Sequence, residues 1–226
     1  MKDVPMCKRC DKIQATVVSR KEKFCDDCFL KFVSQKQRKQ MMSDPYFQDV
    51  FKVMYQDRIR TAEEADSQNA QSNVLVALSF GSSSLVMLDI LNDTLTEQKN
   101  TQQGKTGFQI DVVVCYHTLD EKEVFQELAR KLWTTRYASN KEKLRVFLIG
   151  LDTFFDSSKD NLKTLVLDDK SFSTFEVDYD TKSSGAHSIE KLLSQCPDRS
   201  SREDLLAFIR THLIKRFAFQ NNHKTI

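Results

Sequence analysis

Four of the six cysteines form two closely spaced pairs near the start of the chain. Cys7 and Cys10 make one C-x-x-C pair and Cys25 and Cys28 make the second, with 14 residues between the pairs. Each pair can wrap two thiolates around one ion, and two pairs complete the tetrahedral shell that zinc prefers. Two disulfides are the alternative, and they are rare in a cytosolic chain. The spacing therefore predicts a zinc site, and its closed four-sulfur shell predicts a structural role.

The other two cysteines do not form a pair in the sequence. Cys115 lies inside an apolar run and is expected in the core, whereas Cys196 precedes Pro197 in a loop. A second cysteine pair for persulfide chemistry is therefore not evident outside the proposed zinc module.

A second pattern with possible chemistry is a small-residue loop between two apolar runs, LVALSFGSSSLVML, residues 75–88. Its six central positions correspond to the Ser-Gly-Gly-x-Asp-Ser phosphate loop of ATP pyrophosphatases, which grips phosphate with backbone N–H groups and a helix N-terminus. Phe80 replaces the first glycine and Ser83 replaces the aspartate. A benzyl group where the backbone must approach phosphate is a serious obstacle. We expect a degenerate nucleotide loop, made by Ser79, Gly81, Ser82, Ser83 and Ser84, that does not cleave ATP. An ordinary strand-to-helix turn with serine N-caps is the alternative.

Positive charge is concentrated in the first quarter of the chain. Residues 1–60 hold 14 Lys and Arg against 8 Asp and Glu, whereas the remainder holds 20 against 24. Within this quarter, Lys36, Arg38 and Lys39 follow an apolar helical face. The pattern indicates a contact with a polyanion, with a solvated basic helix end as the alternative.

The elements that must position these residues follow from hydrophobic patterning. Residues 1–60 are expected to form the four-cysteine zinc module and a basic helical segment, in which Asp44-Pro45 starts a helix that continues to about residue 56. Residues 61–72 lack an apolar period and are expected to form a linker. Residues 73–226 are expected to form an α/β domain. No apolar run is long enough for a membrane span, and the start lacks the apolar centre of a signal peptide, so a cytosolic or nuclear location is the default.

Within residues 73–226, buried strands alternate with amphipathic helices. We expect strands at 73–80, 108–118 and 144–151, a short strand within 171–179, and helices at 85–95 and 120–133. A last helix is expected to start at the capping-box pattern Ser201-Arg202-Glu203-Asp204. This alternation predicts a doubly wound, mostly parallel sheet. Three or four strands make a thin sheet, so an incomplete domain is the alternative.

Taken together, these segments resemble the family of cytoplasmic tRNA 2-thiolation protein 2. The resemblance is carried by the paired C-x-x-C, the following segment SRKEKFCDDCFLKFVSQKQRKQMM, the run VLVALSFGSSSLVMLDIL and the late helix SSREDLLAFIRTHLIKRFAF. It implies a zinc module joined to an α/β domain of the adenine-nucleotide alpha-hydrolase (PP-loop ATPase) type. Family members continue further, so the resemblance also implies a C-terminally truncated chain.

The resemblance further implies a cytoplasmic, non-catalytic subunit that forms a heterodimer with the catalytic tRNA thiolase. The complex thiolates 5-methoxycarbonylmethyl-uridine at the wobble position of the tRNAs for lysine, glutamate and glutamine. The partner binds ATP, and a ubiquitin-related carrier, which can also be conjugated to proteins, supplies sulfur. No membrane is involved.

Carried over to this chain, these roles assign zinc to Cys7, Cys10, Cys25 and Cys28. They assign tRNA contact to Lys36, Arg38 and Lys39, which would neutralise phosphates without reading sequence. Two alternatives stay open: an active tRNA sulfurtransferase, and a zinc-ribbon adaptor that binds nucleic acid.

Overall fold

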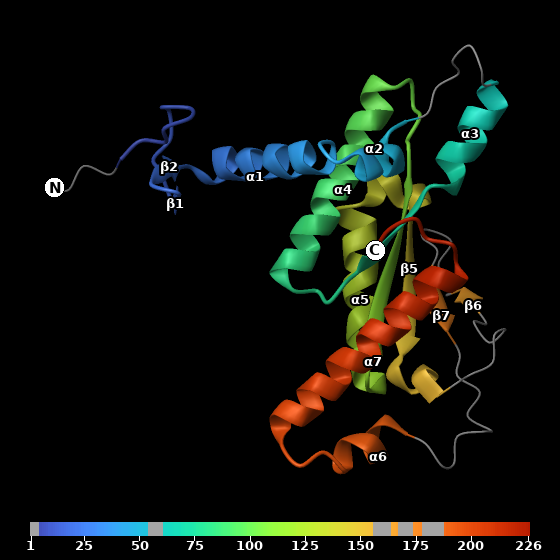
Figure 1. Cartoon of the computed structure of the whole chain (residues 1–226). Coiled ribbons are helices and arrows are strands. Elements are labelled where there is room, and N and C mark those ends of the chain that lie inside the picture. Colours follow the sequence, from blue (N-terminus) through green and yellow to red (C-terminus); the bar gives the residue numbers. More distant parts are fainter. Residues whose placement is uncertain (1–4, 54–60, 156–163, 167–173, 178–187) are drawn as a thin grey trace. The chain divides into compact units, whose positions relative to one another are not determined.

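The computed structural model describes residues 5–53, 61–155, 164–166, 174–177 and 188–226 (Figure 1). The chain divides into two compact units, Met1–Asp49 and Val50–Ile226. This division falls between residues 49 and 50, whereas we predicted from the sequence that the first domain ends at residue 60. None of the described helices is both long and apolar enough to cross a membrane.

The first unit consists of a small hairpin and one long helix. Strands β1 (Val17–Ser19) and β2 (Glu22–Phe24) pair antiparallel and lead into α1 (Asp26–Met41). Its core holds the buried Cys7, Phe24 and Cys25, and the Phe32 ring stacks on Phe24 with centroids 5.4 Å apart. A core of this size contributes little stability by itself, which is the usual situation of a metal-stabilised module.

Helix α2 (Pro45–Phe51) follows at the junction of the two units. Its start is as predicted, because the Asp44 carboxylate accepts a hydrogen bond from the Tyr46 N–H at 2.8 Å and proline occupies the first helical position. The predicted continuation to residue 56 lies partly outside the described residues.

The second unit is an α/β domain built on a five-stranded sheet of order β3-β4-β5-β7-β6. The strands are β3 (Asn73–Ala77), β4 (Gln109–Tyr116), β5 (Leu144–Gly150), β6 (Thr164–Val166) and β7 (Thr174–Val177). The helices are α3 (Ala62–Gln71), α4 (Ser82–Thr101), α5 (Leu119–Thr135), α6 (Ile189–Ser194) and α7 (Arg199–Gln220), with short 3₁₀ helices η1 (Ala138–Lys143) and η2 (Leu151–Phe155). Among the described strands of this sheet, only β6 and β7 pair antiparallel. The predicted α/β class and mostly parallel sheet are confirmed.

Helices cover both faces of this sheet (Figure 1). Helices α4 and α5 connect the parallel pairs β3–β4 and β4–β5, and crossovers of this kind are nearly always right-handed, so both helices belong on one face. The other face packs against α7, where Leu75 and Phe147 share a core with Ile209, Leu213 and Phe217. Between the residues that face α7, each strand has residues that point to the face covered by α4 and α5 and are buried there, as a doubly wound sheet requires.

Residues 61–72, expected to be a linker, contain helix α3. A capping box starts it: the Thr61 hydroxyl accepts from the Glu64 N–H, and the Glu64 carboxylate accepts from the Thr61 N–H. The absence of an apolar period concealed the helix, but this local capping pattern was available in the sequence.

Helix α7 also begins earlier than predicted. Its N-cap is Asp198, whose carboxylate accepts a hydrogen bond from the Ser201 N–H at 2.7 Å. The start predicted at the Ser201 capping-box pattern was therefore wrong by about one turn, because the aspartate after Pro197 is the cap.

After α7 the chain returns to the sheet on the outer side of β3. Leu75 N–H donates to the Thr225 carbonyl at 2.9 Å, and Lys224 N–H donates to the Asn73 carbonyl at 3.0 Å. These bonds form an isolated parallel bridge between Val74 and Thr225. Strand β3 therefore has neighbours on both sides, β4 on one and residues 224–225 on the other.

Candidate metal centre and nucleotide loop

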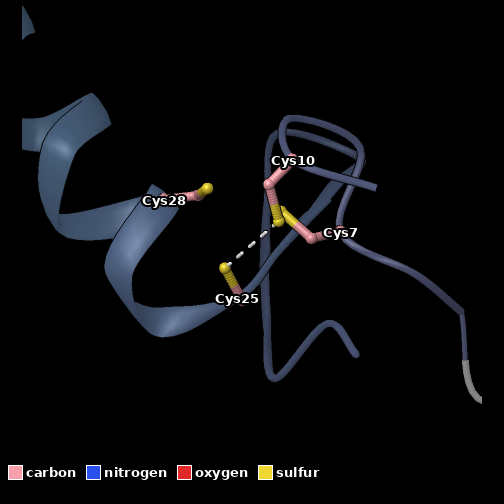
Figure 2. A group of neighbouring side chains, drawn as sticks. All are labelled: Cys7, Cys10, Cys25 and Cys28. Atoms are coloured by element: carbon pink, nitrogen blue, oxygen red, sulfur yellow. Dashed lines mark hydrogen bonds between the residues drawn. The ribbon is translucent and has the colours of Figure 1, made fainter. Parts of the chain in front are cut away.

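The four cysteines predicted to bind zinc come together in the first unit. Their sulfur atoms all lie within 4.8 Å of one another, and Figure 2 shows all four side chains directed toward a common centre. The Sγ atoms of Cys10 and Cys25 are 3.9 Å apart. A tetrahedral shell with Zn–S distances of about 2.3 Å separates its sulfurs by roughly 3.8 Å. The four cysteines are therefore close enough to hold a metal ion, and a soft thiolate set suits zinc.

Backbone hydrogen bonds hold the two cysteine pairs in place. In the first pair, Cys7 N–H donates to the Ile13 carbonyl and Asp11 N–H donates to the Cys7 carbonyl, both at 2.9 Å, which closes a tight knuckle. In the second pair, Cys25 is the N-cap of α1 and Cys28 lies in its first turn. The hairpin joins the pairs, since Lys8 N–H donates to the Lys23 carbonyl at 2.8 Å.

The thiol pKa values differ strongly within the cluster when no metal is present. Burial opposes ionisation of Cys7, but hydrogen bonds from backbone N–H groups of Cys10, Cys25 and Arg9 lower its pKa to about 6. The pKa of Cys28 is raised to about 12 by the Cys25 side chain and by burial. Such crowded sulfurs cannot all ionise together, and a bound divalent cation would allow all four to ionise by displacing the remaining protons.

The loop between β3 and α4 has the backbone conformation that a glycine would favour. Phe80, at the position of the missing glycine, has a φ of 56°, in the left-handed region. Its ring stacks on Phe125 of α5, with centroids 5.3 Å apart. The phenylalanine is therefore accommodated by packing away from the loop onto the neighbouring helix.

The polar groups of this loop bond mainly to one another. The Ser79 and Ser84 hydroxyls are 3.2 Å apart, and the Gly81 N–H donates to the Ser79 hydroxyl at 3.4 Å. The Ser84 hydroxyl also donates to the Gly81 carbonyl at 3.0 Å. Gly81 is the N-cap of α4 and supplies no side-chain cap. Of the predicted loop residues, Ser79, Gly81 and Ser84 thus form one network, while Ser82 and Ser83 lie in the first turn of α4.

The loop borders a small pocket at the carboxyl ends of β3 and β4. The pocket has a volume of about 240 Å³ and is lined by Ala77, Leu78, Ser79, Val113, Cys115, Phe125, Arg210 and Ile214. Burial raises the pKa of the Cys115 thiol to about 11. The lining residues belong to the ends of β3 and β4 and to helices α5 and α7. Ligands of open α/β sheets bind in the crevice outside the carboxyl ends of the strands.

The three cations predicted to contact tRNA lie on α1 but do not form one patch. Lys36 and Lys39 are exposed and are separated by roughly 60° around the helix, whereas Arg38 points about 160° away from Lys36. The Lys36 ammonium lies 5.8 Å from the Phe32 ring centroid, and Arg38 is half-buried. Their contact with tRNA stays a prediction.

Sequence reasoning missed a buried ionic cluster on the α7 face of the sheet. Asp111 is 1% exposed and accepts two hydrogen bonds, both at 2.6 Å, from the Arg145 guanidinium on β5. It also lies 2.8 Å from Nε2 of His223, just after α7. The Asp111 carboxylate thereby ties the returning chain to the sheet. An aspartate inside an apolar strand was the only signal in the sequence.

No protein family model matches the chain, and no solved structure matches it. Curated relatives do: a protein of Candida glabrata is 46% identical over 97% of this chain, one of Vanderwaltozyma polyspora 49% over 99%, and one of Kluyveromyces lactis 48% over 98%. Each is named Cytoplasmic tRNA 2-thiolation protein 2. The chain spans 46–47% of the length of these three relatives. Along nearly its whole length, this chain is therefore homologous to a segment that makes up about half of each of these yeast proteins.

Proposed function

We propose that this chain acts in the cytoplasm, in the 2-thiolation of tRNA, as a non-catalytic subunit of the thiolase complex. The observation that carries the proposal is the 46–49% identity, over 97–99% of the chain, to proteins named for that process. The finer assignment follows the resemblance: a heterodimer with the catalytic thiolase, and wobble 5-methoxycarbonylmethyl-uridine of the tRNAs for lysine, glutamate and glutamine as the modified base. A ubiquitin-related carrier supplies the sulfur and is also conjugated to proteins.

The non-catalytic role is supported by the loop after β3. The Gly81 N–H is directed to the Ser79 hydroxyl, and Phe80 occupies the place of a glycine. Ser83 supplies no carboxylate where the ATP pyrophosphatase loop has aspartate. We therefore assign ATP chemistry to the partner subunit and a PP-loop-like, vestigial nucleotide site to this chain.

The cysteine cluster is proposed to bind one structural zinc ion. Four thiolates fill a tetrahedral shell and leave no position for water or substrate, so the ion would stabilise the first unit without catalysing a reaction. The same unit carries Lys36, Arg38 and Lys39, which we propose as tRNA contacts of the electrostatic, sequence-independent kind.

The test is the amount of 2-thiouridine in bulk tRNA from cells that lack the gene. Thiolated tRNA is retarded in a mercury-containing gel, so its loss in the deletion strain and its return with the reintroduced gene are the expected results. An unchanged thiolated band would reject the proposal and favour a zinc-ribbon nucleic-acid adaptor. Release of pyrophosphate from ATP by the isolated chain in the presence of tRNA would instead identify an active sulfurtransferase.

A further inference from the structure

The turn between β1 and β2 has an unusual composition for its geometry. Ser19 pairs with Glu22, so Arg20 and Lys21 alone make the turn, and their φ angles are 49° and 69°. Two-residue hairpin loops with both φ angles positive are type I′ turns, which strongly favour Asn-Gly. Arginine and lysine carry a β-carbon that disfavours this conformation. The fold therefore does not require these two residue types, and their presence at strained positions points to a function.

The basic side chains at the end of this hairpin have no acidic partner among the described residues of the first unit. Within the part of the chain that the structure describes, no hydrogen bond or ion pair engages the side chains of Arg20, Lys21 or Lys23, and all three residues are exposed. The hairpin's acidic residue, Glu22, is paired with Lys8 at 2.5 Å. We call Arg20, Lys21 and Lys23 the hairpin tip. It presents three positive charges to solvent.

The hairpin tip is better disposed to meet a polyanion than the cations of α1. Lys36 lies over the Phe32 ring, and Arg38 is half-buried and engaged in other contacts. By contrast, Lys23 faces outward beside Val18, its cross-strand partner, and Arg20 and Lys21 project from the end of the hairpin.

We propose that the hairpin tip contacts the phosphate backbone of tRNA. This inference rests on the proposed function, and it names the surface of the metal module that meets the RNA. Lysine and arginine side chains without carboxylate partners bind phosphates regardless of base sequence. A protein partner is less well suited, because binding hot spots in protein interfaces are rich in aromatic residues. Phe24, the hairpin's aromatic residue, is only 4% exposed.

The turn geometry provides a test that separates charge from folding. The double variant Arg20→Asn/Lys21→Gly removes two charges and installs the residues that a type I′ turn favours. The control Lys131→Gln/Lys141→Gln removes two exposed charges from the second unit. Equilibrium binding of fluorescently labelled, unfractionated tRNA is measured for the zinc-loaded, 226-residue chain over about 50 to 200 mM KCl. Metal content and melting temperature are measured on the same samples.

The expected result is weaker tRNA binding by the turn variant, with a plot of log affinity against log salt that is shallower by about 1.4 to 1.8. Its metal content and melting temperature should equal or exceed those of the unchanged chain, and the control should bind normally. A turn variant that binds with unchanged affinity and slope overturns the inference, as does an equal loss in the control.

Two further outcomes would show that the hairpin tip has a different role. If the turn variant loses affinity for polyglutamate but keeps its affinity for tRNA, the hairpin tip serves an acidic protein and the inference is wrong. The thiolation assay in cells is independent of this binding measurement. Suppose that 2-thiouridine is lost on gene deletion but the turn variant binds tRNA normally. This result would reject the contact between the hairpin tip and tRNA, and it would still support the proposed function.

Discussion

The rings of Phe80 and Phe125 stack with centroids 5.3 Å apart and an interplanar angle of 19°. This contact joins the loop after β3 to helix α5 and fixes a phenylalanine in the left-handed region. The loop is thereby held in its shape by an aromatic contact with a neighbouring helix, where an ATP-binding loop relies on glycine.

Replacing Phe80 by glycine and by alanine separates the stack from the backbone strain. Both variants lose the ring contact, worth about 0.5–1.5 kcal/mol beyond burial. Only glycine relieves the left-handed conformation, so Phe80→Gly should be more stable than Phe80→Ala by about 1 kcal/mol. Urea unfolding of the two purified variants measures this difference. An alanine variant as stable as the glycine variant would show that position 80 carries no such strain.

In cells, Phe80→Gly should leave tRNA thiolation unchanged. The substitution restores one glycine of the phosphate loop but not the aspartate replaced by Ser83, so we expect no gain of ATP chemistry. The mercury-gel assay measures the thiolated fraction, with the unchanged gene as reference. A strong gain or loss of 2-thiouridine would mean that the loop binds a ligand that matters for the reaction.

Cys25→Ser should abolish metal binding and unfold the first unit. Cys25 is 3% exposed, lies at the N-cap position of α1 and belongs to the small core of Cys7 and Phe24. Elemental analysis should give one zinc per chain before the change and none after it. Cys196→Ser, which alters a half-buried cysteine outside the cluster, is the matched control and should keep its zinc. Retention of one ion by the Cys25 variant would reject the four-cysteine site.

Zinc affinity should fall as the pH is lowered. Without metal the pKa of Cys28 is about 12, so its proton must leave whenever the ion binds at neutral pH. This proton alone makes the affinity drop about tenfold for each pH unit of acidification, and other protonated thiols steepen the drop. Competition with a chromogenic chelator between about pH 8 and 6 measures the slope. An affinity independent of pH would exclude thiolate ligands.

Asp111→Asn should destabilise the second unit. The change removes the carboxylate that Arg145 and His223 share, and breaking a buried charge cluster costs about 3 kcal/mol, at the low end of its range because the Arg145 side chain is 38% exposed. Urea unfolding measures the loss, and Asp204→Asn on the exposed side of α7 is the control.

The same cluster gives stability a defined pH dependence. Burial would raise the Asp111 pKa, but hydrogen bonds from His223 and Arg145 hold it below its ordinary value. Because this pKa is lowered, the ionised carboxylate stabilises the fold fully above its unfolded-state pKa of about 3.9. The contribution should therefore begin to decline as the pH falls below about 4 and should be lost once the pH has passed through the lower folded-state pKa. Acid unfolding of the Asn variant should lack that component. Identical acid transitions in the two proteins would contradict the assignment.

The sequence predicted the parts of the structure that local patterns control. Continuous apolar runs indicated β3, β4 and β5, and the paired cysteines predicted a cluster that the structure brings together. Prediction failed where the deciding interaction is distant or purely local and polar. Nothing near Thr225 signals that it pairs with Val74, and the capping box at Thr61 was outweighed by the missing apolar period of α3. The turn at Arg20 and Lys21 was not predicted either, because arginine and lysine are residue types that disfavour the type I′ conformation found there.

The bridge between Val74 and Thr225 has a consequence for how this protein folds. Strand β3 carries the loop of Phe80, and among the residues that the structure describes its outer edge pairs with a segment about 150 positions later in the chain. Closing a loop of that length is entropically unfavourable, and parallel pairings between distant segments form slowly. During synthesis the strand emerges long before its last neighbour, and its unpaired N–H and C=O groups stay available to other strands. We therefore expect the edge of β3 to be the site where nascent or shortened chains aggregate.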